Sequence, residues 1–185
     1  MAFSVSEFQA AGLPLGGARP SLFTVVVETP DAVPNVGARF SFTCKAASLP
    51  ESKVSSIEMP YFGRKIPFAG SRTFSPWTVT VINDEDFQVR HAMELWSNLI
   101  NTHEGNLRDV SMATSADYKT LATVTQYSKT GIPIRTYELV DVWPTDIAAI
   151  TMDWNQPDTI EEFTVTLAYS FWRPVAPSTT GSFAV

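Results

Sequence analysis

The strongest constraint on the fold is an alternating stretch near the end of the chain. From Ile160 to Trp172, large apolar side chains recur at every second position, with small or polar side chains between them. The large set is Phe163, Val165, Leu167, Tyr169 and Phe171, and the small set is Thr164, Thr166, Ala168 and Ser170. Because side chains alternate between the two faces of a β-strand, the pattern predicts a strand with one face against a core.

Similar runs of β-branched and aromatic residues fill most of the chain and predict a mainly antiparallel β structure. The other predicted strands are Ser21–Glu28, Ala38–Ala46, Ser56–Tyr61, Arg64–Ala69, Trp77–Ile82, Tyr118–Tyr127, Ile134–Val142 and Ile147–Asp153. With 185 residues, 44% of them hydrophobic and 17% charged, the chain fits one domain with one core.

One segment breaks the strand pattern and predicts an α-helix over about residues 84–103. It follows Asn83, and its first turn holds three carboxylates, where the helix dipole favours negative charge. Gly105 is the expected left-handed stop. Helical spacing places one apolar stripe along this segment: Val89, Ala92, Met93, Trp96, Leu99 and Ile100. We therefore expect an amphipathic helix lying against the sheet.

Charge and cysteine content narrow the classes of function. A formal net charge of −6 argues against a protein that coats nucleic acid, because that requires clustered cations. The single cysteine, Cys44, cannot form an internal disulfide and is expected to pack as a small apolar residue. No membrane span or secretory signal is recognisable, so we expect a soluble protein made in the cytoplasm.

The candidate catalytic and metal motifs all have simpler interpretations. The acidic trio 84–86 is interpreted as a helix cap, and His91 and His103 are spaced too far apart for a helical zinc pair. The segment Asp153–Thr159 lacks the central Gly and terminal Glu of a calcium loop and is typical of a turn. We predict no catalytic residue, no metal ligand and no cofactor.

The segment YFGRKIPFAGSRTF, from Tyr61 to Phe74, is basic and aromatic within an acidic chain. Its glycines do not have P-loop spacing, and a strand rather than a helix follows it, so it does not predict a phosphate site. Turn residues and two prolines indicate a hairpin-like arm. So many apolar side chains would not face water alone, which leaves two alternatives: the arm folds back on its own core or docks on another subunit.

Ordered motifs extend over most of the chain. The central block, Glu58 to Trp96, contains Arg64-Lys65-Ile66, Ala69-Gly70-Ser71-Arg72-Thr73-Phe74, Trp77-Thr78-Val79-Thr80-Val81 and Asn83-Asp84-Glu85. The flanking motifs are Arg19-Pro20 with Leu22-Phe23, Phe42 with Cys44-Lys45-Ala46, Leu49-Pro50, Ala116-Asp117-Tyr118-Lys119, Trp143-Pro144-Thr145, Asp153-Trp154 and the run Phe163 to Ala168. In this order they resemble the tail tube proteins of T4-like contractile-tailed bacteriophages.

The resemblance implies a β-barrel or sandwich with one flanking helix, and a structural rather than enzymatic role. It implies hexameric rings that stack into a hollow tube inside a contractile sheath, in the tail of the virion. The implied partners are other copies of the chain and sheath, baseplate and tail-terminator proteins, with DNA passing through the lumen without specific binding. The matched block predicts a tube domain over 19–173, flanked by an N-terminal extension (1–18) and a C-terminal tail (174–185).

With a neighbouring subunit implied, the arm is the expected interface. The predicted interface residues are Tyr61, Phe62, Arg64, Lys65, Ile66, Phe68, Arg72 and Phe74. We expect the three cations to pair with acidic residues of neighbours. Two alternatives stay open: the tube of a contractile bacteriocin or secretion-type particle, and a monomeric ligand-binding β domain. The segment Thr29–Gly37 exceeds a short turn, and two roles stay open for it: decoration of the tube exterior or contact with a sheath subunit.

Overall fold

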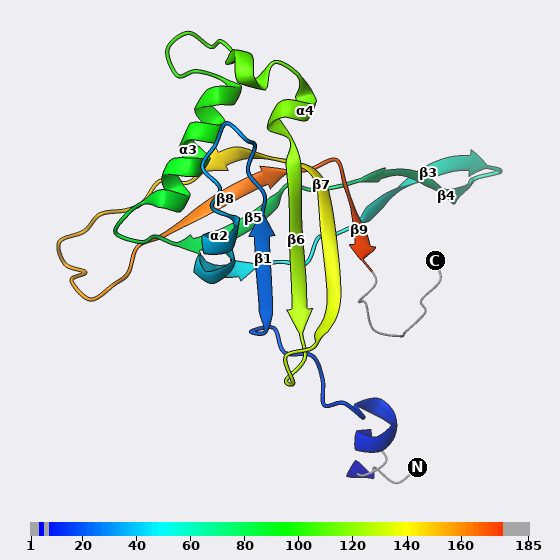
Figure 1. Ribbon diagram of the computed structural model, residues 1–185. Coiled ribbons are helices and arrows are strands. Elements are labelled where there is room, and N and C mark those ends of the chain that lie inside the picture. The colour runs from blue at the N-terminus through cyan, green and yellow to red at the C-terminus, as the bar shows by residue number, and fades with distance from the viewer. Residues whose placement is uncertain (1–3, 6–7, 176–185) are drawn as a thin grey trace.

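The computed structural model describes residues 4–5 and 8–175, and it is mainly β (Figure 1). The strands are β1 (Phe23–Val27), β2 (Cys44–Ala47), β3 (Lys53–Tyr61), β4 (Arg64–Thr73), β5 (Trp77–Ile82), β6 (Thr120–Tyr127), β7 (Pro133–Ile147), β8 (Glu162–Ala168) and β9 (Phe171–Val175). The helical elements are η1 (Phe8–Gly12), α2 (Gly37–Thr43), α3 (Gln88–Ile100), η2 (Val110–Met112) and α4 (Ser115–Tyr118). The predicted C-terminal tail lies almost wholly outside the described residues.

The main sheet has the order β1-β6-β7-β8-β5-β2, with β9 also paired to β7, and every pairing in it is antiparallel. The long strand β7 takes part in two layers. Its residues 136–140 pair with both β6 and β9, whereas residues 143–147 pair with β8. The mainly antiparallel β fold with a flanking helix is therefore confirmed, as two layers that share one strand.

Both β7 and its partner bend where they pass between the layers. Asp141 has a φ of 62°, in the left-handed region, and Ser170 separates β8 from β9 on the opposite strand. The Ser170 hydroxyl donates a 2.7 Å hydrogen bond to the Asp141 carboxylate, and its backbone N–H donates to Val140. The continuous strand predicted over Ile160–Trp172 is thus wrong: the period-two pattern crosses a bend, and Phe171 beyond it is 44% exposed.

The core lies between the layers and beneath the helices. Its fully buried members come from β1, β5, β6, β7, β8 and α3, with Phe40 of α2 and Met112 of η2. The predicted stripe of α3 is confirmed, because Val89, Ala92, Met93 and Trp96 are buried. The indole of Trp96 also donates a 3.0 Å hydrogen bond to the backbone carbonyl of Tyr118, which satisfies its polar group inside the core.

The predicted strand Ala38–Ala46 is wrong over most of its length, because α2 occupies residues 37–43. Phe40 is fully buried and Phe42 is 89% exposed, so these two aromatic residues do not share a face as residues two apart in a strand would. Asn35 accepts a 3.0 Å hydrogen bond from the Gly37 N–H and so supports the first turn. The strand begins only at Cys44.

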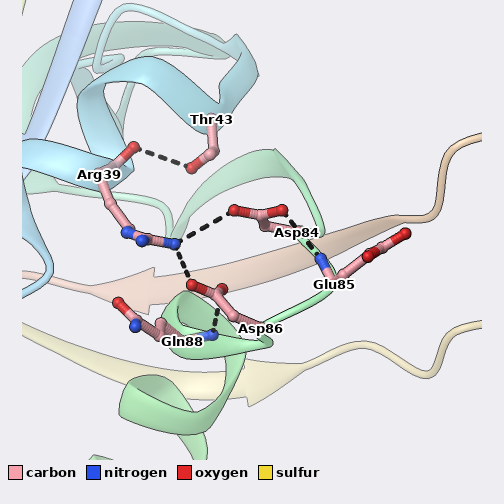
Figure 2. Close-up of polar contacts among 6 residues, drawn as sticks. All are labelled: Arg39, Thr43, Asp84, Glu85, Asp86 and Gln88. Carbon is pink, nitrogen blue, oxygen red and sulfur yellow. Dashed lines mark hydrogen bonds and ion pairs between the residues drawn. The ribbon is translucent and has the colours of Figure 1, made fainter.

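The predicted start and end of the long helix are also wrong. The helix begins at Gln88 after Phe87, which has a φ of 53°, and it has no carboxylate in its first turn. Asp84 and Asp86 lie before the helix and pair with Arg39 of α2 (Figure 2). The predicted capping role holds for Asp86, whose carboxylate also accepts a 3.2 Å hydrogen bond from the N–H of Gln88, the first helical residue. At the other end, the helix stops at Ile100, before extended Asn101, rather than at Gly105.

The predicted strand Ile147–Asp153 is wrong, since β7 ends at Ile147 and a long loop over residues 148–161 leads to β8. Within the loop, the Asp153 carboxylate accepts a 2.9 Å hydrogen bond from the Asn155 N–H. This side-chain-to-backbone bond is that of a turn, as the sequence predicted. The loop projects from the side of the body opposite to β3 and β4 (Figure 1).

Candidate subunit-interface arm

Strands β3 and β4 form a two-stranded hairpin that projects from the body (Figure 1). We call this hairpin, residues 53–73, the arm. It turns at Phe62 and Gly63, with φ values of 44° and 78°. Two consecutive positive φ values are those of a tight primed turn, whose twist matches a β-hairpin. Neither strand hydrogen-bonds to the main sheet, so the alternative in which the arm folds back on its own core is wrong.

The arm has one strongly apolar face. Ile57 lies opposite Phe68 and Met59 opposite Ile66, and directly opposed residues share a face of a hairpin. Tyr61 continues this face towards the tip. Exposed fractions are 58% for Ile57, 57% for Met59, 61% for Tyr61, 40% for Ile66 and 51% for Phe68. We refer to these five residues as the apolar face of the arm.

The opposite face is polar and supports itself. Lys65 Nζ lies 2.7 Å from the Glu58 carboxylate, on the neighbouring strand. Pro60 and Pro67 lie on this face too, and they fit because each strand of a two-stranded hairpin has a free edge. The arm is therefore amphipathic, with an ion pair on one face and exposed apolar side chains on the other, where Arg64 near the tip is the cation.

The predicted interface residues divide into two groups. Tyr61, Phe62, Arg64, Lys65, Ile66, Phe68 and Arg72 lie on the arm, with Phe62 92% exposed at its tip. Phe74 lies at the root, half-buried, with its ring 5.9 Å from that of Tyr169.

The three predicted cations have different surroundings. Lys65 is paired with Glu58, and Arg72 donates to the hydroxyl of Ser52. Arg64 lies opposite Tyr61 in the hairpin, and its guanidinium group has no ion pair or hydrogen-bond partner among the described residues. Pairing with a neighbouring subunit stays a prediction for all three, and Arg64 has the least competition within its own chain.

Sequence reasoning missed Ile57 and Met59 as members of the apolar face of the arm. The signal was present, since they alternate with Ser56, Glu58 and Pro60 in a segment already predicted as a strand. Gly70 was another missed feature: a Cβ there would overlap the Ser55 hydroxyl and lie 3.1 Å from the Ser55 carbonyl oxygen. Only glycine permits the strands to approach this closely beside the β-bulge near the root.

Burial raises the pKa of the one cysteine, Cys44, to about 11, so its thiol is a poor nucleophile at neutral pH. Within residues 4–5 and 8–175, no group of three or more metal-ligating side chains is gathered. No helix in this part of the chain is long and apolar enough to cross a membrane.

Comparison with known proteins identifies the family. The sequence pattern of the phage tail tube protein family matches residues 18–174. The chain belongs to this family. It is 36% identical over 157 residues to the tail tube protein gp19 of Enterobacteria phage T4, covering 84% of this chain and 91% of the relative. This confirms the resemblance to tail tube proteins that the sequence motifs indicated. It also confirms the expected location of the protein, the tail of the virion.

Solved structures of tube components share the fold of this tail tube protein. The tube-terminating cap of the anti-feeding prophage superposes with a TM-score of 0.63 at 16% identity, over 86% of this chain and 91% of the other. A sheath-tube complex of an extracellular contractile injection system gives a TM-score of 0.56 at 14% identity, over 95% and 99% of the two chains. These structures share the overall fold of this chain.

Proposed function

We propose that the chain assembles into hexameric rings, and that these stack into a hollow tube inside a contractile sheath. The apolar face of the arm is the observation that supports this best. Five large side chains on a two-stranded hairpin, all between 40% and 61% exposed, form a patch that a free monomer does not bury. A two-stranded hairpin alone is marginal in water, so a neighbouring copy that covers it would also stabilise it.

The partners and the passage of DNA follow from the same assembly. Relatives of this fold occur in complexes described as sheath-tube, baseplate and tube-terminating cap, and we extend those contacts to this chain. Each copy contributes a formal charge of −6, so a ring is strongly acidic and does not retain passing phosphates. The role is structural, and we propose no enzymatic activity, cofactor or metal.

Assembly and the part played by the arm are tested together by charge reversal. Arg64→Glu is the sharpest variant, because Arg64 has no partner within the described chain, whereas changing Lys65 would also break its pair with Glu58. Tubes in negative-stain micrographs should become fewer and shorter. Lys129→Glu, at an exposed turn between β6 and β7, is the matched control and should assemble normally.

Unchanged tube length and abundance for Arg64→Glu would contradict the role of the arm. Absence of any ring or tube in the unaltered protein, even with purified baseplate as template, would contradict the assembly itself. Packaged DNA in native particles distinguishes a phage from a bacteriocin-like or secretion-type particle.

A further inference from the structure

A groove lies on the body between the segment before α3 and the loop joining β7 to β8. It consists of two adjoining hollows of about 520 and 690 Å³, which share Thr159, Ile160 and Glu161. Asn83 to Phe87 form one wall, and the loop around Met152 and Trp154 forms the other. We refer to these walls and the shared residues as the acidic groove.

The acidic groove contains large apolar side chains that the fold leaves uncovered. Trp154 is 101% exposed, Met152 78%, Ile160 69% and Phe87 40%. Isolated exposed apolar residues are ordinary, but four around one groove mark an interaction surface. A partner for this surface must itself present apolar side chains.

Several carboxylates of the groove lack a cation, although Asn83 donates a 3.0 Å hydrogen bond to Glu161 and the Asn155 N–H donates one to Asp153. Arg39 pairs with Asp84 and Asp86 but leaves Glu85, whose carboxylate points away from it (Figure 2). Glu85, Asp153 and Glu161 have no ion-pair partner among the described residues. The partner should therefore combine apolar side chains with an unpaired cation.

The arm has this combination, and it lies on the other side of the body (Figure 1). We propose that the acidic groove of one copy receives the apolar face of the arm of a second copy, with Arg64 directed at Glu85, Asp153 and Glu161. Two complementary patches on opposite sides of a subunit make a head-to-tail contact, which closes a ring or extends a stack. This inference rests on the proposed self-assembly and names its acceptor surface.

A second acidic hollow fits the arm less well. It has a volume of about 570 Å³ and is lined by Glu28, Asp31, Asp117 and Asp141. Lys119 also lines it, with Nζ 3.9 Å from the Asp141 carboxylate. None of its lining residues is among the large exposed apolar side chains, so it offers nothing to cover the apolar face. It supplies the control position for the test.

Cysteine cross-linking between two single variants tests the contact. In a Cys44→Ser background, Met59→Cys on the arm is mixed with Ile160→Cys in the groove and mildly oxidised. We expect a disulfide-linked dimer of the two variants, because neither carries both cysteines. In the first control, Ala32→Cys, exposed at the second hollow, replaces Ile160→Cys as the control acceptor position. In the second control, Ser56→Cys, on the polar face of the arm, replaces Met59→Cys. Both controls should cross-link far less.

Charge exchange supplies a second readout on the same dimer. Adding Arg64→Glu to the arm variant should lower the dimer yield at least about tenfold, since each 1.4 kcal/mol of lost affinity is a factor of ten. Adding Glu85→Arg to the groove variant should restore part of it. Equal yields with the control acceptor, or dimers formed only between two arm variants, would overturn the inference.

The outcomes separate this contact from tube assembly. Tubes that form in micrographs without the cross-link between positions 59 and 160 would overturn the acceptor but leave the tube function standing. The cross-link without tubes would support the acceptor and count against stacked rings. Neither cross-link nor tubes, in variants whose thermal unfolding matches the unaltered chain, would overturn both.

Discussion

Truncation of one side chain on the apolar face tests whether this face drives assembly. Phe68 is 51% exposed in the free subunit. An aromatic side chain offers about 200 Å², so roughly 100 Å² of Phe68 remains to be covered by a neighbour. At ~25 cal/mol per Å², that burial contributes about 2.5 kcal/mol. Phe68→Ala should therefore raise the critical concentration for assembly by a factor of roughly 70.

Sedimentation separates assembled from unassembled protein. Repeated over a range of total protein concentrations, it measures the critical concentration for assembly directly. The thermal unfolding of the unassembled chain should barely change, because Phe68 has no place in the core. Val110→Ala, which removes an exposed apolar side chain away from the arm, is the control. If Phe68→Ala assembles at the concentration of the unaltered chain while its arm stays folded, the face does not drive assembly.

Further predictions concern the root of the arm, the cysteine and the bend between the layers. Gly70→Val should separate the strands beside Ser55 and make the arm more susceptible to limited proteolysis, while body fragments of unaltered mobility remain. At pH 8 the Cys44 thiol, with its raised pKa of about 11, should react with iodoacetamide roughly a hundredfold more slowly than an exposed thiol. Because this raised pKa is lost on unfolding, the free energy of unfolding should fall as the pH rises from about 9 towards 11. Asp141→Val should lower the free energy of unfolding in urea by about 1–3 kcal/mol, since a β-branched residue is strained at this φ. Asp141→Asn, which tolerates the left-handed region and can still accept from Ser170, should cost clearly less.

Sequence periodicity predicted the elements whose environment is local and regular. β5 shows this, because its alternating residues meet a buried face and a partly exposed one as expected. The α3 stripe was readable for the same reason. The arm was readable as a hairpin from its turn residues, although its projection from the body depends on the absence of pairing partners, which no local pattern encodes.

The errors arose where tertiary contacts decide the local structure. Phe40 and Phe42 are two residues apart, as side chains on one face of a strand are, but only Phe40 packs in the core. The segment that contains them forms the helix α2. Only Asp86 of the acidic trio bonds to the start of the helix, and the pairing of Asp84 and Asp86 with Arg39 was missed because Arg39 lies far away in the sequence. The acidic groove was missed for a similar reason, since residues 83–87 meet residues 152–161 only after folding.

The bend at Asp141 and Ser170 has a mechanical consequence. Because β7 and its partner both cross from one layer to the other there, the layers are joined by continuous backbone as well as by packed side chains. A load applied to one layer is transmitted to the other along covalent bonds, and the ladder of hydrogen bonds between the two strands shares it in parallel. A subunit pushed along a tube axis would then yield at its contacts with neighbours before its own two layers slide apart.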